Sequence, residues 1–323
     1  MFPPLRLKAA WNFGGLSARE LMIRTWQKIN QNEIQTRAAG VAFYAMLALV
    51  PFIGLVLALA VQLLPDLTGG SEAASGVANL TVEELQNRLK QSFPDEASSV
   101  MVEQITRLQK EPPVGLLSIG LAITLWLASS LFVAVIDAMN RIYGIKERRN
   151  IIKLRIIAII MTLIQALILV GSLVVIVGGP MILKWLGLSE IQANIATVVQ
   201  YLVVELMVLM SFALAFYVAP DSDQRWEWIT PGSILGSLAF IGVTLLFRLY
   251  VEHFADYDKA YGPLGGVMVL LFWFWISSLV LLTAGQINKI IEDASPLGKN
   301  FGQRSNPTEP PDFTKMEPVP ANP

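Results

Sequence analysis

The chain has 323 residues, of which 54% are hydrophobic and only 15% are charged, and its formal net charge is −1. Soluble domains carry about 25% charged residues, so this composition indicates a membrane protein, and the near-zero net charge supplies no basic field for nucleic acid. With no cysteine and one histidine, His253, the chain cannot form disulfides, thiolate metal sites or a histidine-rich metal site. We therefore expect no cofactor.

Six long apolar runs divide the sequence. Each is close to the roughly 20 residues that a helix needs to cross the bilayer core, and Glu205 is the one fully charged residue inside them. The sequence therefore predicts an all-α, polytopic membrane protein with six transmembrane helices. The predicted spans are 38–64, 114–136, 156–179, 191–219, 229–247 and 260–288.

Basic residues are distributed unevenly between the two sides of these spans. Of the 24 lysines and arginines, 17 lie on the side that holds both termini and 7 on the other side. Because cytoplasmic segments are enriched in Lys and Arg, both termini are expected in the cytoplasm. The N-terminal residues lack the pattern of a signal peptide, so the first span is expected to direct insertion.

The segment before the first span reads as an amphipathic helix over residues 16–36. Ser17 and Glu20 fit a capping box at its start, and Met22, Trp26 and Ile29 share one face. The pattern predicts an interfacial helix on the membrane surface. The alternative is a helix that packs against the ends of the other spans.

The gap between the first two spans, residues 65–113, is too long for a turn. Thr81 and Glu84 fit a second capping box, and prolines 112 and 113 close the segment, so we predict a helical extracytoplasmic hairpin. The chain divides into an N-terminal cytoplasmic segment (1–15), a six-helix membrane domain with this insertion (16–293), and a disordered Pro-rich cytoplasmic tail (294–323).

Proline and glycine mark two of the spans. Pro51 lies inside the first span, where it removes a backbone hydrogen bond and predicts a helix kink. Thr230 and Pro231 fit an N-cap and first position at the start of the fifth span. Gly232 and Gly236 form a GxxxG pattern that permits close helix approach.

A polar group ends the second span. Asp137 and Arg141 are four residues apart, so they share a helical face and can pair, with Asn140 beside them. Charged residues near membrane depth tend to face a partner or a cavity. An ion pair at headgroup level is one interpretation; the other is a cytoplasmic gate or a contact from Arg141 to a lipid phosphate.

Glu205 lies in the middle of the fourth span. An acidic residue at a helix centre costs about 3 kcal/mol on insertion, so it should be protonated, paired or in contact with water. Gln165, Gln200 and Gln286 are candidate partners. A structural hydrogen bond and a proton- or cation-linked transport site are the two interpretations.

At the outer end of the last two spans, charged residues alternate with aromatic ones around Tyr257 and Tyr261, followed by Gly262. Aromatic residues are typical of the membrane interface, so an anchored outer turn is the simpler interpretation. The alternative is an outer mouth that binds a polar headgroup or a solute.

Three stretches of the chain resemble the YihY/BrkB (virulence factor BrkB-like) family of bacterial inner-membrane proteins. They are residues 37–51 with a central Tyr44, residues 138–144, and residues 257–262 before the tryptophan-rich last span. Ala48 stands where the family usually has serine. The resemblance covers about residues 16–293, and the three motifs occur in the same order as in the family.

This resemblance implies a bacterial inner-membrane location with six spans and both termini inside. It adds candidate transport or gating positions at Arg37, Tyr44, Gln286, Tyr257, Tyr261 and Gly262. At Gln286 the family pattern is altered, because the preceding small residues are exchanged. Family members have been labelled ribonucleases and are now usually treated as transporter-like or envelope proteins.

Three functions are compatible with these observations, and a fourth is not favoured. The first is transport or flipping of a lipid or envelope precursor, the second an ion- or proton-coupled solute carrier, and the third a scaffold for envelope assembly. Expected partners are membrane lipids, with a second copy of the chain or an envelope protein as further candidates, and no nucleic acid. An enzyme is disfavoured because metal-dependent hydrolysis needs clustered acidic residues. The acidic residues on the cytoplasmic side are instead scattered along the sequence, namely Glu147, Asp221, Asp223 and Glu227.

Overall fold

Long apolar sequences with few breakers fold into long helices, and helices make up the described part of this chain. The computed structural model describes residues 11–63, 119–185, 190–223, 229–254, 263–295 and 302–304. The elements in order are η1 (Phe13–Gly15), α2 (Ala18–Gln31), α3 (Ile34–Leu63), α7 (Ile119–Tyr143), α8 (Ile151–Trp185), α9 (Glu190–Val218), α10 (Pro231–Phe254) and α12 (Pro263–Ala294). The all-α prediction is confirmed over these residues.

Five of the helices are long and apolar enough to cross a membrane, and they fall on the second to sixth predicted spans. The first predicted span falls on α3, which has a shorter apolar stretch, Ile34–Leu49, within the residues searched. The prediction of several membrane-length helices is therefore confirmed. The predicted hairpin over 65–113 lies outside the described residues.

Capping residues set the starts of two helices as the sequence predicts. The Ser17 hydroxyl accepts a hydrogen bond from the Glu20 amide at 3.2 Å, and the Glu20 carboxylate accepts one from the Ser17 amide at 3.0 Å, which completes the capping box. At α10, the Thr230 hydroxyl accepts from the Ser233 amide at 3.1 Å. On α2, Met22 and Trp26 are exposed, whereas Ile29 packs against the main core.

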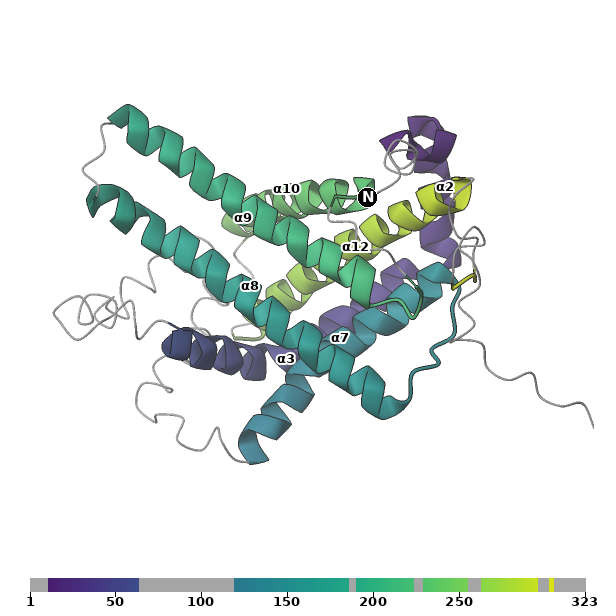
Figure 1. The fold of residues 1–323 in the computed structure, drawn as a ribbon, viewed down its shortest axis with the longest axis horizontal. Coiled ribbons are helices and arrows are strands. Elements are labelled where there is room, and N and C mark those ends of the chain that lie inside the picture. Colours follow the sequence, from purple (N-terminus) through teal and green to yellow (C-terminus); the bar gives the residue numbers. More distant parts are fainter. Residues whose placement is uncertain are drawn as a thin grey trace, which may run out of the picture.

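The main core lies where the ends of six helices meet. Residues from the start of α3, the end of α7 and the end of α12 form its centre, including Ile34, Ile136 and Leu282, which are almost fully buried. Figure 1 shows α8 and α9 side by side, crossing the direction of α3, α7 and α12. We call the region formed by the starts of α3, α8 and α10 and the ends of α7, α9 and α12 the core end.

Close approach of α10 to α12 depends on the two glycines of the GxxxG pattern. A Cβ atom at Gly232 would lie 2.4 Å from the Ala284 carbonyl oxygen, and one at Gly236 would lie 2.7 Å from the Ala284 Cβ. The Gly232 amide donates to Asn288 Oδ1 at 2.8 Å. Small residues here let the two backbones meet, as the pattern predicts.

Pro51 does not end its helix. Helix α3 continues through it to Leu63, and its ribbon bends along its length in Figure 1. A mid-helix proline removes one intrahelical hydrogen bond and crowds the preceding turn. The predicted kink at Pro51 stays a prediction.

Candidate functional site

A cavity of about 390 Å³ opens at the core end. Its wall combines three cationic side chains, two carboxylates and one amide with four aliphatic residues. We call it the core-end pocket. Its lining residues are Arg37, Val133, Ile136, Asp137, Asn140, Arg141, Ile145, Lys146, Glu147 and Leu154. Four candidates from the sequence, Arg37, Asp137, Asn140 and Arg141, therefore share one cavity.

A glycine turn at the end of α7 builds one wall of this pocket. Gly144 has φ +68°, a left-handed conformation that favours glycine. The Gly144 amide donates to the Arg141 carbonyl at 3.1 Å, and the Ile145 amide donates to the Asn140 carbonyl at 2.8 Å, which is the Schellman pattern of a helix C-terminus. The chain then turns back along α7 and brings Lys146 into the pocket wall.

The predicted pair between Asp137 and Arg141 is wrong. Asp137 Oδ2 instead accepts from Arg37 Nη1 at 2.7 Å, so its partner comes from α3. The four-residue spacing puts Asp137 and Arg141 on one face, but α3 packs directly against that face and supplies a cation at shorter reach. Arg141 is exposed, and among the described residues the Asp137 carboxylate is taken by Arg37 and not by Arg141.

The pocket therefore has unpaired positive charge at its mouth. Its second carboxylate, Glu147, binds Arg149 through two hydrogen bonds of 2.8 Å and 2.7 Å. That leaves the Arg141 and Lys146 side chains without a carboxylate partner in the described part of the chain. The same wall includes apolar residues such as Val133 and Leu154.

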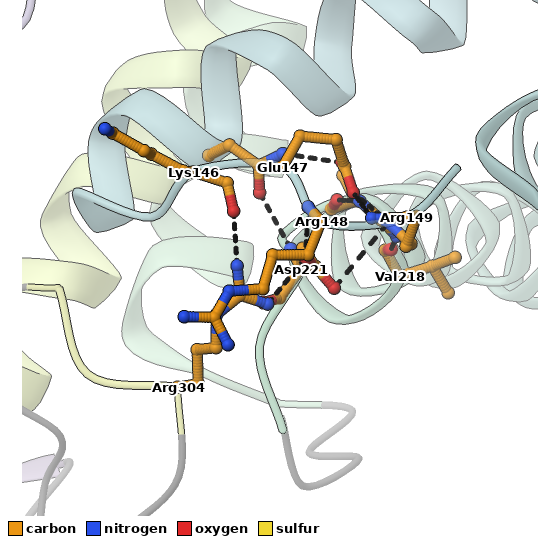
Figure 2. Close-up of polar contacts among 9 residues, drawn as sticks. Lys146, Glu147, Arg148, Arg149, Val218, Asp221 and Arg304 are labelled. Carbon is orange, nitrogen blue, oxygen red and sulfur yellow. Dashed lines mark hydrogen bonds and ion pairs between the residues drawn. The ribbon is translucent and has the colours of Figure 1, made fainter. Parts of the chain in front are cut away.

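A polar network joins the loop after α7 to the end of α9, and Figure 2 shows Glu147, Arg149, Asp221 and Arg304 of this network. Arg149 Nη2 donates to the Ala219 carbonyl at 2.9 Å, and its Nε lies 3.8 Å from Asp221 Oδ1. Arg304 Nη1 donates to Asp221 Oδ2 at 2.5 Å, and Asn140 Oδ1 accepts from the Asp221 amide at 2.7 Å. We call Asn140, Glu147, Arg149, Asp221 and Arg304 the ion-pair cluster.

These contacts lower the pKa of both carboxyls in the cluster. Burial raises the pKa of Asp221. Hydrogen bonds from Arg304 and from the Arg148 amide, together with the nearby arginine charges, lower the pKa by more than burial raises it, so the pKa of Asp221 is below its ordinary value. For Glu147, burial is likewise outweighed by hydrogen bonds from Arg149, and its pKa is lowered too. Both groups are therefore ionised at neutral pH.

Part of the predicted disordered tail is bound at this site. The Gly302 amide donates to the Tyr143 carbonyl at 2.9 Å, and the Arg304 carbonyl accepts from the Asp223 amide at 2.9 Å. The guanidinium of Arg304 also donates to the Lys146 carbonyl. Residues 302–304 of the predicted tail are held by these hydrogen bonds, because the Arg304 side chain reaches the half-buried carboxylate of Asp221. Residues 296–301 and 305–323 lie outside the described part of the chain, so the predicted disorder there stays a prediction.

Sequence reasoning missed the cluster because it treated Glu147 and Asp221 as scattered acids. They lie 74 positions apart in the sequence numbering, yet Arg149 contacts both. The Tyr143-Gly144 step was the available signal, since a glycine after a helix predicts a chain reversal that brings the next residues back to α7.

Glu205 is not bonded to any of its three predicted partners. Gln165 Nε2 donates to Ser211, Gln200 Nε2 donates to the Ile176 carbonyl, and Gln286 Oε1 accepts from Asn32 Nδ2. Glu205 Oε2 is buried with no hydrogen-bond partner in the described part of the chain. The predicted pairings are wrong because each glutamine has a nearer polar partner.

Two further candidates, Tyr44 and Gln286, are not among the residues that line the pocket. Tyr44 is 42% exposed and its ring contacts Phe43 edge-on. Gln286 is buried between α12 and the end of α2. Tyr257, Tyr261 and Gly262 lie outside the described residues.

Over the described ranges, no group of three or more His, Cys, Asp or Glu side chains could hold a metal ion. Glu147 and Asp221 come together through Arg149, and their oxygens are used by arginine and amide donors. A carboxylate pair bridged by guanidinium is neutralised, which is the opposite of what a metal needs from its ligands.

Comparison with known proteins gives a consistent result. The family described as Virulence factor BrkB matches residues 25–308. YfkH of Bacillus subtilis, described as ribonuclease-like, is 28% identical over 271 residues, which cover 82% of this chain and 93% of that protein. A UPF0761 membrane protein of Psychromonas ingrahamii is 21% identical over 85% of this chain and 88% of its own length.

Another UPF0761 membrane protein, from Tolumonas auensis, is 29% identical over 52% of this chain and 55% of its own length. No solved structure matches. The family match and these relatives agree with the membrane-length helices and with the resemblance found from the sequence motifs.

Proposed function

The chain belongs to the Virulence factor BrkB family of membrane proteins, and from this premise we propose that it handles a phosphate-bearing lipid or envelope precursor in the bacterial inner membrane, as a transporter or flippase. The observation that carries the proposal is the core-end pocket, where Arg141 and Lys146 stand without carboxylate partners beside apolar wall residues. A lipid presents the complementary pair of surfaces, an anionic headgroup and an apolar chain.

The charges around the pocket support an anionic ligand. Guanidinium groups bind phosphate oxygens through charge-assisted hydrogen bonds, and a lysine ammonium acts as a second point charge. Arg37 is already held by Asp137, so it positions the wall, whereas Arg141 can turn toward a ligand. A cavity of about 390 Å³ is large enough for a headgroup, because small-ligand sites begin at roughly 300 Å³.

The same end of the bundle carries the basic segments that favour a cytoplasmic location. We propose that the core end faces the cytoplasm, that α3 also crosses the membrane as the first of six spans, and that α2 lies in the membrane interface with Met22 and Trp26 toward lipid. The pocket would then open at the level of the inner-leaflet headgroups, where an anionic lipid is presented to it.

A second function, an ion- or proton-coupled solute carrier, is favoured by one specific observation. Glu205 Oε2 is buried without a partner among the described residues, and ionisable residues inside membrane spans often mark ion or proton pathways. This candidate ranks second because Glu205 is a single group, whereas the pocket gathers several. A scaffold role without transport is the outcome if neither site binds a ligand.

The proposal is tested by native mass spectrometry of the protein extracted in mild detergent and supplied with phosphatidylglycerol or with neutral phosphatidylcholine. We expect phosphatidylglycerol to be retained in preference, and retention to fall about tenfold in Arg141→Gln/Lys146→Gln, because hydrogen bonds to charged groups contribute about 1.5–3 kcal/mol. Lys153→Gln is the matched control, since Lys153 is exposed and does not line the pocket. Equal retention of both lipids by wild type and variant would reject the pocket as a headgroup site.

A further inference from the structure

A guanidinium lies on the α7–α8 contact with an unusual set of partners. Arg155 Nη1 donates to the Trp126 carbonyl at 3.1 Å, to Ser129 Oγ at 3.0 Å and to Ser130 Oγ at 3.3 Å. Its Cζ lies 3.9 Å from the centre of the Trp126 ring. Three oxygens and one indole therefore fix the orientation of this side chain.

None of these partners carries a negative charge. Within the described residues its hydrogen bonds go to neutral oxygens and not to a carboxylate, although Arg155 lies inside the membrane-length stretch Ile151–Ile176. A cation in such a position is normally paired with an anion or exposed to a water-filled cavity. The structure thus holds a positioned cation whose counter-ion is not supplied by the described protein.

The guanidinium keeps donors for a ligand. All of its hydrogen bonds use Nη1, so Nε and Nη2 have no partner in the described part of the chain, and neither atom is fully buried. Trp126 is 50% exposed, so the stacked pair is open to the surroundings of the helix. Nε and Nη2 form the edge of a guanidinium that matches two oxygens of a phosphate.

This cation also lies in line with the core-end pocket. On a helix with 3.6 residues per turn, positions 126, 130, 133, 137 and 141 of α7 fall within about 80° of one another. Trp126 and Ser130 hold Arg155, whereas Val133, Asp137 and Arg141 line the pocket. Ser130 and Arg141 are about 16 Å apart along the axis at 1.5 Å per residue, too far for one headgroup to bind both.

We propose that Arg155, with Trp126, Ser129 and Ser130, forms a second binding site for the phosphate of an anionic lipid, on the same face of α7 as the pocket. The inference deepens the proposed function and rests on it for the identity of the ligand. Phosphate oxygens accept from Nε and Nη2, the Trp126 face shields the guanidinium from above, and the acyl chains lie against α7 and α8. Two sites in a row on one helix face give a lipid a path along it.

The test counts the phosphatidylglycerol molecules that the purified full-length protein retains in native mass spectrometry. Phosphatidylcholine and inorganic phosphate are added in separate experiments, the phosphate at about 50-fold excess, on the order of what a weak anion site needs. We expect wild type and Lys153→Gln to retain two molecules and Arg155→Gln to retain one, with second-site occupancy about tenfold lower. Arg155→Lys keeps the charge but lacks the fork, so it should fall between them.

The outcomes separate the two proposals. If Arg155→Gln retains two molecules, the second site is rejected whatever Arg141→Gln/Lys146→Gln shows; if only Arg155→Gln loses lipid, the pocket fails and the second site stands. Displacement of the lipid by inorganic phosphate, or equal retention of phosphatidylcholine, would overturn the assignment to an anionic lipid. A second measurement leaves Arg155 unchanged, so it does not depend on the folding of the Arg155 variants. Bromine-labelled phosphatidylglycerol should quench the tryptophan fluorescence of wild type more than that of Trp126→Phe, and equal quenching would contradict the site.

Discussion

The contact of α10 with α12 gives a prediction whose size follows from the structure. In Gly232→Ala the new Cβ would lie 2.4 Å from the Ala284 carbonyl oxygen and 2.5 Å from Asn288 Oδ1. Ordinary contacts begin near 3.4 Å, so the helices must move apart by about 1 Å or Asn288 must leave. Overpacking of this kind costs about 1–3 kcal/mol, and loss of the Gly232–Asn288 hydrogen bond of 2.8 Å adds about 1 kcal/mol.

Gly242 is the matched control, because it lies on the same helix and its Cβ would meet nothing within 4 Å. Alanine is favoured over glycine in a helix by about 1 kcal/mol, so Gly242→Ala should be neutral or stabilising, and the net loss in Gly232→Ala should be about 1–3 kcal/mol. Thermal unfolding in detergent, followed by circular dichroism, measures the difference. Equal midpoints for the two variants would refute the close approach of α10 to α12.

Three further predictions concern the polar groups. Glu205→Gln should keep the fold and be as stable as wild type or up to about 2 kcal/mol more stable, since it replaces a buried carboxylate that lacks a partner at Oε2 by a neutral amide of the same shape. A clear loss of stability would show an ion pair that is absent from the described part of the chain. The folded pKa values of Asp221 and Glu147 are lowered, so their contribution to the free energy of unfolding should be complete at neutral pH. That contribution should begin to fall as pH drops below the ordinary values of 3.8 and 4.5 and be lost as pH falls through the lower folded values. In Asp221→Asn the loss of stability at acid pH should be smaller than in wild type, and an equal loss in both proteins would count against the cluster. Purified protein should not cleave RNA, and cleavage that disappears in Asp221→Asn would establish the enzyme that this account disfavours.

Much of the fold could be predicted because hydrophobic length and helix capping act locally. The apolar runs, the Ser17–Glu20 box and the Gly232–Gly236 pattern each depend on neighbours within a few residues, and the structure has all three. The pocket was partly predictable for the same reason, since Asp137 and Arg141 lie within one turn of each other on α7.

What the sequence could not supply was the choice among competing partners. Arg37 reaches Asp137 from another helix 100 positions away, and Arg304 reaches Asp221 from beyond the last helix. A short sequence spacing makes a pair geometrically possible, but packing decides which cation is nearest. Arg155 shows the same limit, because its role depends on the level at which α8 crosses α7 rather than on any motif.

The most direct measurement is transbilayer movement of a fluorescent phosphatidylglycerol in vesicles that contain the purified protein, read by chemical quenching of the outer leaflet. The account predicts that wild-type protein and Lys153→Gln move the lipid and that Arg141→Gln/Lys146→Gln moves it about tenfold more slowly. Movement no faster than in protein-free vesicles, or equal rates in wild type and the double variant, would contradict the claim that the core-end pocket handles a lipid headgroup.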